Sequence, residues 1–176
     1  MPDTAVTMAV TEPFVSLHPA TAGTASPPAG WVRVAVSASG VCNADIGTTA
    51  ATGKGAAFPV TPGHEVAGVI AEAGDAVDGW KAGDRVAVGW FGGSCGHCAY
   101  CRTGDVVHSA KWNIPGLAYP GGWAQNITVP ADALARVPDG LGLFDAAPFG
   151  CAGVTDGDRR RCLRSGRSHR AARRRP

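Results

Sequence analysis

Three cysteines stand at equal spacing in a glycine-rich stretch of the chain, GGSCGHCAYCRTGD (92–105). They are Cys95, Cys98 and Cys101, and two residues separate each from the next. Thiolates this close together in a loop converge on one point, and a divalent zinc ion is the usual reason for such convergence. The spacing therefore predicts a metal-binding loop in this part of the chain.

A second set of possible metal ligands is spread along the sequence. Its members are Cys42, the neighbouring pair His64 and Glu65, and Cys151. Two cysteines and one histidine would give a zinc ion three protein ligands and leave its fourth position open, as in catalytic zinc sites. The alternative is structural: taken singly, Cys42 and Cys151 are small core residues, and His64 bonds a backbone carbonyl.

Short runs of alternating apolar residues, separated by glycine and proline turns, indicate the elements that must position these side chains. In WVRVAVSAS (31–39), the valines at 32, 34 and 36 fall on one side of a strand. Similar runs predict strands at 66–74, 84–90 and 125–130. We expect a loop at 19–30 and a helix in 141–155, which two glycines weaken. Many short strands with frequent turns indicate a mainly β fold, a barrel or a sandwich.

The composition is that of a globular protein with one domain and a core of its own. The chain has 176 residues, of which 45% are hydrophobic, and no apolar run is long enough to span a bilayer. The N-terminal stretch MPDTAVTMAVTEPF lacks the basic cluster of a signal peptide. We therefore expect a cytoplasmic protein, in which cysteines stay reduced and bind metal rather than form disulfides.

The charge divides the chain near residue 155. Residues 1–155 carry seven basic and twelve acidic side chains, whereas 156–176 carry nine arginines and two aspartates. The last segment also contains no Val, Ile, Phe, Trp or Tyr. A segment that buries so little apolar surface does not offset its ordering entropy, so we expect a disordered, Arg-rich tail.

Four stretches in order carry a resemblance to a known family: GVCNAD (40–45), PGHEVAGVIAEAGDAVDGWKAGDRVAVGW (62–90), GGSCGHCAYCRTGD (92–105) and PFGCAGVT (148–155). Through these four stretches, the chain resembles the zinc-containing alcohol dehydrogenases of the medium-chain dehydrogenase/reductase family over most of residues 30–155. The resemblance implies that residues 1–155 form the GroES-like catalytic domain, a partly open β-barrel with short helices and a zinc lobe.

The resemblance also implies a chemistry. Cys42, His64 and Cys151 would bind the catalytic zinc, Glu65 would lie next to it, and Asp45 would orient a ligand. The metal would lower the pKa of a bound alcohol, and hydride would pass to NAD or NADP held in a Rossmann domain. The partner implied is a small alcohol or aldehyde, and such enzymes commonly associate into oligomers through the cofactor domain.

Two departures from the family pattern concern the metal sites. Family members often carry a proton relay at the positions of Ala44 and Gly47, which neither donate nor accept a proton. The fourth cysteine of the family's structural zinc lobe falls on Ser109, a poor zinc ligand. We therefore expect the adjacent His108, or a water, to complete a zinc site with Cys95, Cys98 and Cys101; the alternative is a metal-free lobe.

A third departure is that the resemblance stops at Thr155. Nothing like the glycine-rich GxGxxG turn of a cofactor domain occurs in the sequence, so we expect the Rossmann domain to be absent. We hypothesise that 156–176 is an out-of-frame reading of GC-rich coding DNA and that the chain is a truncated dehydrogenase, inactive alone. Cys162 in the tail should be free. An exposed apolar face is expected near 141–155, where a cofactor domain would dock.

Two other functions fit parts of the sequence. A zinc-binding module without catalysis, pairing with a complementing chain, would use the same cysteines. An Arg-rich tail would also fit a nucleic-acid tether. We expect no specific nucleic-acid binding, however, because the body of the chain carries net negative charge and no interleaved basic and aromatic residues.

Overall fold

The computed structural model describes residues 4–50 and 58–155, and nothing is stated about the structure of the others. The Arg-rich segment 156–176, with Cys162 and the predicted disorder, lies outside the described residues. None of the helices in the described part has the length and apolar character needed to cross a bilayer.

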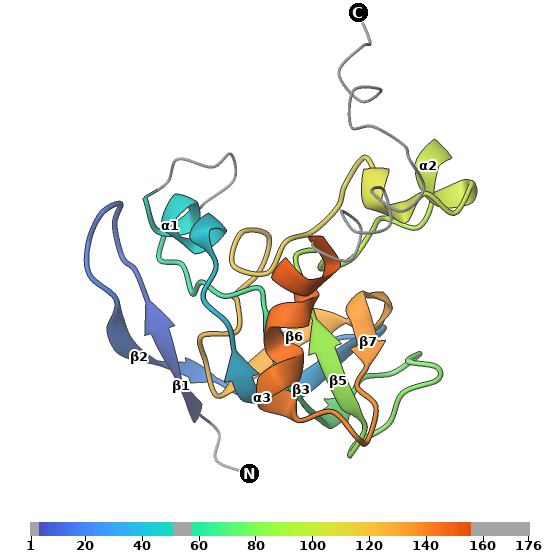
Figure 1. The fold of residues 1–176 in the computed structure, drawn as a ribbon, viewed down its shortest axis with the longest axis horizontal. Helices are drawn as coiled ribbons and strands as arrows, with labels where there is room; N and C mark the ends of the chain where they lie inside the picture. The colour runs from blue at the N-terminus through green and yellow to red at the C-terminus, as the bar shows by residue number, and fades with distance from the viewer. Residues whose placement is uncertain (1–3, 51–57, 156–176) are drawn as a thin grey trace, which may run out of the picture.

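In the described residues, seven strands dominate the architecture (Figure 1), and four of them, β3 to β6, fall on the runs from which the sequence predicts strands. They are β1 (Thr4–Ala9), β2 (His18–Gly23), β3 (Trp31–Ser39), β4 (Val66–Ala73), β5 (Arg85–Val88), β6 (Asn126–Pro130) and β7 (Leu134–Arg136). The helices are short: α1 (Asn43–Thr49), α2 (Ala99–Arg102) and α3 (Leu143–Ala146), with 3₁₀ turns at Val106–His108, Ala131–Ala133 and Ala147–Gly150. The expectation of a mainly β, partly open barrel with short helices is confirmed.

The central sheet is antiparallel, with the strand order β6-β3-β4-β5-β7, and β1 pairs with β2 in a separate hairpin. Val32 and Val34 are fully buried on one side of β3, and Val36 packs against the same cluster, as the alternation predicts. The cluster is completed by side chains of the neighbouring strands, mainly Val66, Ile70, Val86, Val88, Ile127 and Val129. Because β-branched residues fill a pleated surface well, this sequence suits a curled sheet.

Two local expectations need correction. The segment 19–30 is not all loop, because β2 (His18–Gly23) pairs along β1. Pro19 is tolerated there since the strand lies at an edge, where its missing N–H breaks no ladder. The expected helix in 141–155 is divided into α3, a 3₁₀ turn over Ala147–Gly150 and a helical turn from residue 152. Pro148 lies in the 3₁₀ turn and supplies no N–H to a continuous helix.

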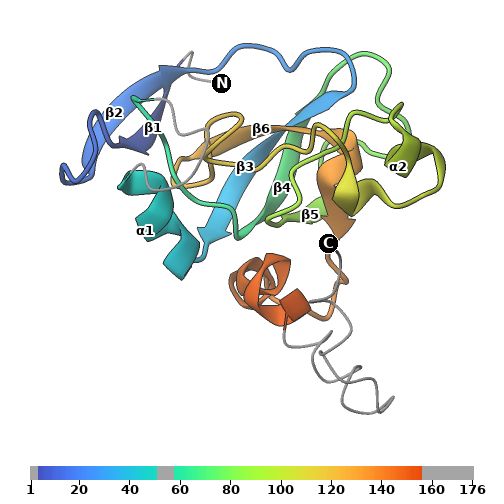
Figure 2. The ribbon, with the colours of Figure 1, turned by 90° about the horizontal axis from the view of Figure 1, so that it is seen from above.

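The arrangement places possible metal ligands at two separate positions. Figures 1 and 2 show α1 at one end of the molecule, near the β1–β2 hairpin, and the segment carrying α2 projecting at the other. Figure 2 also shows α3 and the turn after it lying against one side of the sheet. The chain therefore returns, after β7, to the region where α1 and the start of β4 meet.

Candidate functional site

The four dispersed candidates, Cys42, His64, Glu65 and Cys151, come together in the structure. Their ligand atoms all lie within 4.8 Å of one another. Cys42 immediately precedes α1, His64 and Glu65 immediately precede β4, and Cys151 follows the 3₁₀ turn after α3. His64 and Glu65 are buried and the two cysteines are half-buried. The fold thus gathers residues 109 positions apart in sequence.

His64 is held by one ring nitrogen and leaves the other without a partner. Its Nδ1 lies 3.2 Å from Oδ1 of Asp45. Its Nε2 is buried and makes no hydrogen bond within the described residues. A buried polar atom left unpaired costs about 1–3 kcal/mol. Metal-ligating histidines characteristically give the second ring nitrogen to a carboxylate, so this arrangement fits a metal at Nε2.

Asp45 organises the group through both carboxylate oxygens. Oδ2 accepts a hydrogen bond from the backbone N–H of Cys42 at 2.8 Å, and Oδ1 accepts one from Gly63 at 3.2 Å. Only 2% of the Asp45 residue surface is exposed. Gly63 adopts φ +101°, a left-handed conformation that favours glycine, and this directs its N–H to the carboxylate. Asp45 therefore orients two candidate ligands at once.

The two thiols of this group lie at a spacing that suits zinc. The Sγ atoms of Cys42 and Cys151 are 3.9 Å apart. Two sulfurs at the usual Zn–S distance of about 2.3 Å and a tetrahedral angle would be about 3.8 Å apart. Hydrogen bonding from the backbone of Ala44 lowers the pKa of Cys42. Burial, followed by the charge of Cys42, raises the pKa of Cys151 to about 11. A divalent ion would offset the repulsion between two thiolates.

The pKa of His64 reflects opposing effects. Burial lowers it, but the hydrogen bond and charge of Asp45, together with Cys42, outweigh burial and raise the pKa above its ordinary value. The ring therefore carries a proton readily when no metal is bound. Because a metal must displace that proton, loading of the group depends on pH.

Glu65 sits beside the group and is held by the segment that carries Cys151. Its Oε1 accepts a hydrogen bond from the backbone N–H of Ala152 at 3.3 Å. Gly40 packs directly against the carboxylate, because a Cβ atom there would clash with Oε2. The carboxylate is thus close enough to the thiols to approach a bound cation.

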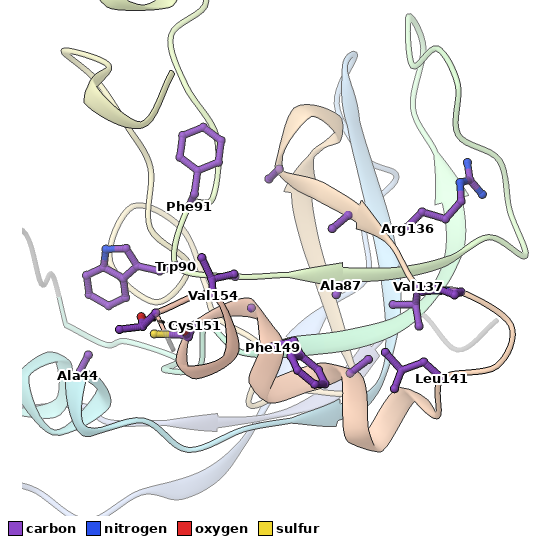
Figure 3. A pocket seen from close by; sticks show the side chains of 17 residues that line it. Ala44, Ala87, Trp90, Phe91, Arg136, Val137, Leu141, Phe149, Cys151 and Val154 are labelled. Carbon is purple, nitrogen blue, oxygen red and sulfur yellow. Dashed lines mark hydrogen bonds between the residues drawn. The ribbon is translucent and has the colours of Figure 1, made fainter. Parts of the chain in front are cut away.

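An apolar cleft of about 700 Å³ opens beside Cys151. Figure 3 shows Cys151, Trp90 and Ala44 at one end of it and Leu141 and Val137 at the other. The Trp90 ring packs edge-on against His64 with centroids 4.8 Å apart. The apolar surface expected near 141–155 is present: the side chains of Phe144, Phe149 and Val154 are exposed.

The second cluster is formed by Cys95, Cys98 and Cys101, whose sulfurs also lie within 4.8 Å of one another. Cys98 precedes α2 and Cys101 lies in it. The Cys95–Cys101 and Cys98–Cys101 sulfur distances are 3.9 and 3.5 Å. The equal spacing in sequence thus converges on one point in space.

The structure does not bring His108 to these sulfurs, in contrast to the expectation that it is the fourth ligand. Its Nδ1 lies 2.7 Å from Oδ1 of Asp105, and its side chain is 69% exposed. The next residue, Ser109, is buried instead, with Oγ 3.4 Å from Sγ of Cys95 and 3.9 Å from Sγ of Cys98. The 3₁₀ turn at Val106–His108 directs these adjacent side chains differently.

Hydrogen bonds to the sulfurs favour the thiolate form in this lobe. The pKa of Cys95 is lowered to about 5, chiefly by the hydrogen bond from the Ser109 hydroxyl and further by backbone N–H groups. The N–H of Ala110, 3.5 Å from Sγ of Cys98, lowers the pKa of that thiol. Thiolates are the form that binds metal, so the lobe is prepared for a cation.

Sequence reasoning missed three contributors to the sites. It identified Ser109 as the position of the fourth ligand but assigned it no contact. It gave no role to Trp90, because a tryptophan at the end of a predicted strand carries no signal of a nearby histidine. It also missed the contact between the backbones of Gly89 and Gly150. This contact joins residues far apart in sequence and positions the neighbouring Cys151.

Comparison with known proteins places the chain in a family. Residues 28–139 match the alcohol dehydrogenase GroES-like domain. An alcohol dehydrogenase of Geobacillus stearothermophilus is 40% identical over 129 residues, which are 72% of this chain and 38% of that protein. The chain therefore spans well under half the length of this curated relative.

Solved structures agree in fold. A cobalt- and zinc-bound thermostable alcohol dehydrogenase from Pyrobaculum aerophilum is 32% identical, with a TM-score of 0.76 over 84% of this chain and 45% of that one. The structure of CAD from Helicobacter pylori in complex with NADP(H) is 26% identical, with a TM-score of 0.81 over 92% and 49%. With the domain match over residues 28–139, these likenesses show that the chain belongs to the zinc-containing, medium-chain alcohol dehydrogenase family.

Proposed function

We propose that this chain is the metal-binding part of a zinc-dependent alcohol dehydrogenase, which converts a small alcohol to an aldehyde or ketone with NAD or NADP. The observation that carries the proposal is the buried, unpaired Nε2 of His64 beside the thiols of Cys42 and Cys151. A zinc ion bound by these three donors would keep its fourth coordination position open for substrate, which is the pattern of a catalytic zinc site.

Each residue of the group has a separate task in this proposal. Cys42, His64 and Cys151 hold the zinc, and Asp45 fixes the His64 ring through Nδ1. A zinc ion held there would act as a Lewis acid that favours loss of the alcohol proton. Glu65, kept in place by Ala152, is near enough to assist exchange of water and substrate. The same carboxylate also adds negative charge that favours a cation.

The cleft beside Cys151 would receive the apolar part of the substrate. Its walls near the metal group come from Trp90 and Ala44, and neither side chain transfers a proton. The hydroxyl of Thr48 is directed to the carbonyl of Ala44, at 3.3 Å, and so is not free to relay one. We infer that the proton leaves the cleft through solvent rather than through a side chain of α1.

The lobe of Cys95, Cys98 and Cys101 would hold a second, structural zinc. We also take residues 1–155 as one GroES-like domain, with a nicotinamide-binding unit contributed from outside the described residues or by a complementing chain. All five cysteines of the described residues are free. Reduced thiols support a reducing compartment such as the cytoplasm.

A zinc-binding module without catalysis is the second candidate, and the apolar cleft argues against it. A module that only stores or displays zinc gains nothing from about 700 Å³ of apolar space beside its half-buried ligands. The structure of CAD from Helicobacter pylori holds NADP(H), which supports a nicotinamide partner for this chain as well.

The test is metal analysis of the purified chain together with a nicotinamide assay. We expect two zinc ions per chain, one of which is lost in Cys42→Ala and the other in Cys98→Ala. When the chain is supplied with a nicotinamide-binding domain of a relative, oxidation of alcohols should depend on Cys42. Retention of both zinc ions by Cys42→Ala, or turnover unaffected by it, would contradict the proposal.

A further inference from the structure

The lobe carries a serine where a fourth ligand would stand, and the contacts of that serine show how it is used. We propose that the lobe binds its metal through the thiolates of Cys95, Cys98 and Cys101 alone, and that the fourth coordination position is open to an exogenous ligand. The inference rests on the second, lobe metal of the proposed function and does not depend on the site at Cys42.

Two of the three sulfur separations are close to those of a tetrahedral site, and all three lie within 4.8 Å. Two of the separations are 3.5 and 3.9 Å. Tetrahedral zinc with Zn–S bonds of about 2.3 Å requires sulfur separations of about 3.8 Å. A metal would therefore enter with little movement of α2 or of the loop before it.

The hydroxyl of Ser109 has no lone pair left for a metal. A serine hydroxyl has one proton to donate and two lone pairs that accept. Ser109 Oγ accepts the backbone N–H groups of Cys95 at 3.2 Å and Lys111 at 3.3 Å. It donates its proton to Sγ of Cys95 at 3.4 Å. With these contacts made, and with Sγ of Cys98 also 3.9 Å from the same oxygen, Ser109 is a hydrogen-bond donor to a ligand rather than a ligand.

No other described residue completes the site. Any described His, Cys, Asp or Glu with a ligand atom within 4.8 Å of all three sulfurs would belong to the same group, and none does. His108 is turned to Asp105 and is mostly exposed. The three cysteines are only half-buried, so a small molecule has access to them. The ligand class that fits the open position is a thiol or an imidazole, since zinc accepts sulfur and nitrogen donors.

The experiment uses cobalt as a spectroscopic substitute in the full chain. Cobalt bound by thiolates gives charge-transfer absorption that grows with the number of Co–S bonds. Difference spectra between the wild type and Cys98→Ser isolate the lobe. Added 2-mercaptoethanol should shift the lobe's d–d bands in the wild type. Ser109→Cys should raise the lobe's charge-transfer intensity by about one third, as four thiolates replace three, and abolish the shift.

Two matched variants control the result. Ser94→Cys adds a thiol next to the lobe, but the Ser94 side chain is directed to Asp132 at 3.4 Å, so the spectrum should stay that of the wild type. His108→Ala should also leave it unchanged, and zinc retention against a chelator should rise only in Ser109→Cys.

Four outcomes would overturn the inference. A wild-type lobe with four-thiolate intensity, a wild-type lobe insensitive to 2-mercaptoethanol, or a spectrum altered by His108→Ala would each show that the fourth position is filled. If Cys98→Ser leaves the cobalt spectrum unchanged while Cys42→Ala alters it, the lobe holds no metal. The inference then fails and the proposed dehydrogenase site stands. If instead Cys42→Ala leaves the cobalt spectrum unchanged while Cys98→Ser alters it, only the proposed dehydrogenase site is contradicted.

Discussion

The backbone of Gly89 packs directly against the backbone of Gly150, and neither position has room for a side chain. A Cβ atom on Gly89 would clash with the carbonyl oxygen of Gly150, and one on Gly150 would lie 2.8 Å from Cα of Gly89. The N–H of Trp90 also donates to the Gly150 carbonyl at 3.3 Å. This contact joins the end of β5 to the turn that presents Cys151, so it sets the position of one candidate ligand.

The first prediction is that Gly150→Ala weakens the site at Cys42. The added methyl group must displace β5 or the turn, at a cost of about 1–3 kcal/mol for overpacking. Cys151 would then move from its partners, and the variant should retain one zinc ion where the wild type retains two. Zinc content and thermal unfolding are the measurements.

Gly140→Ala is the matched control for this prediction. Gly140 lies in the same part of the chain, and nothing stands within 4 Å of a Cβ atom added there. The control should keep both metals and the wild-type stability. Equal zinc content in both variants would show that the Gly89–Gly150 contact does not position Cys151.

The second prediction concerns Asp45. Asp45→Asn keeps the shape of the side chain but removes the charge that orients His64 and favours the cation. Loss of such a supporting carboxylate lowers metal affinity by about 10–100-fold. Competition with a chromophoric chelator measures the effect. The exposed residue Asp139, changed to Asn, loses the same charge and should leave the affinity unchanged. Equal affinities in the two variants would count against the role of Asp45.

Much of the fold could be predicted because its signals are local. Alternation in 31–39 identifies β3, since Val32, Val34 and Val36 lie on the face of that strand that packs into the core. The strand β2 was missed because its residues, HPATAG, have low β-propensity, and it forms only by pairing with β1. The break of the helix at 147–150 coincides with Pro148, which is visible in the sequence, whereas the contact of Gly150 with Gly89 is not.

The candidate site, like the fold, could be predicted from the sequence only in part. The resemblance in sequence pointed to Cys42, His64 and Cys151, and the structure brings them together. The sequence led to the expectation that His108 or a water is the fourth ligand of the lobe, but the His108 side chain is directed to Asp105, because ligand type alone does not fix side-chain direction. A 3₁₀ turn ends at His108 and sends Ser109 inward. Side-chain direction in such a short turn depends on contacts beyond the turn, here the N–H group of Cys95, 14 residues earlier.

The third prediction is a pH dependence of cysteine alkylation in the metal-free chain. The pKa of Cys95 is about 5, so its thiolate dominates above that pH and is lost as the pH falls through 5. The pKa of Cys151 is about 11, so its reactive fraction should rise about tenfold per pH unit through neutrality. Peptide mapping after brief iodoacetamide treatment should find Cys95 modified at pH 7 and Cys151 protected.

The variant Ser109→Ala tests whether Cys95 is alkylated more readily than Cys151 because of its lower pKa or only because of its greater exposure. The hydroxyl of Ser109 is the largest contributor to the low pKa of Cys95, so its removal should move the onset of alkylation to higher pH. The accessibility of Cys95 would change little with the loss of one buried oxygen. An unchanged pH profile in Ser109→Ala would contradict the assignment.

The last prediction is that the 176-residue polypeptide, produced by itself, has negligible alcohol dehydrogenase activity although it binds zinc. The described residues form a sheet of antiparallel strands and contain no parallel βαβ unit of the kind that binds dinucleotides. Hydride transfer needs the nicotinamide held against the substrate, and such positioning supplies about 7–11 kcal/mol in favourable systems. The exposed side chains of Phe144, Phe149 and Val154 should also make the polypeptide prone to association.

The measurement follows NADH and NADPH formation with primary, secondary and aromatic alcohols, alongside light scattering. Addition of a separately produced nicotinamide-binding domain from a relative should reduce association, because it would cover the apolar surface beside Cys151. It should also raise turnover, and Cys42→Ala should remove that gain. Zinc-dependent turnover by the polypeptide alone, lost in Cys42→Ala, would show that the residues outside the described ranges supply a cofactor site after all.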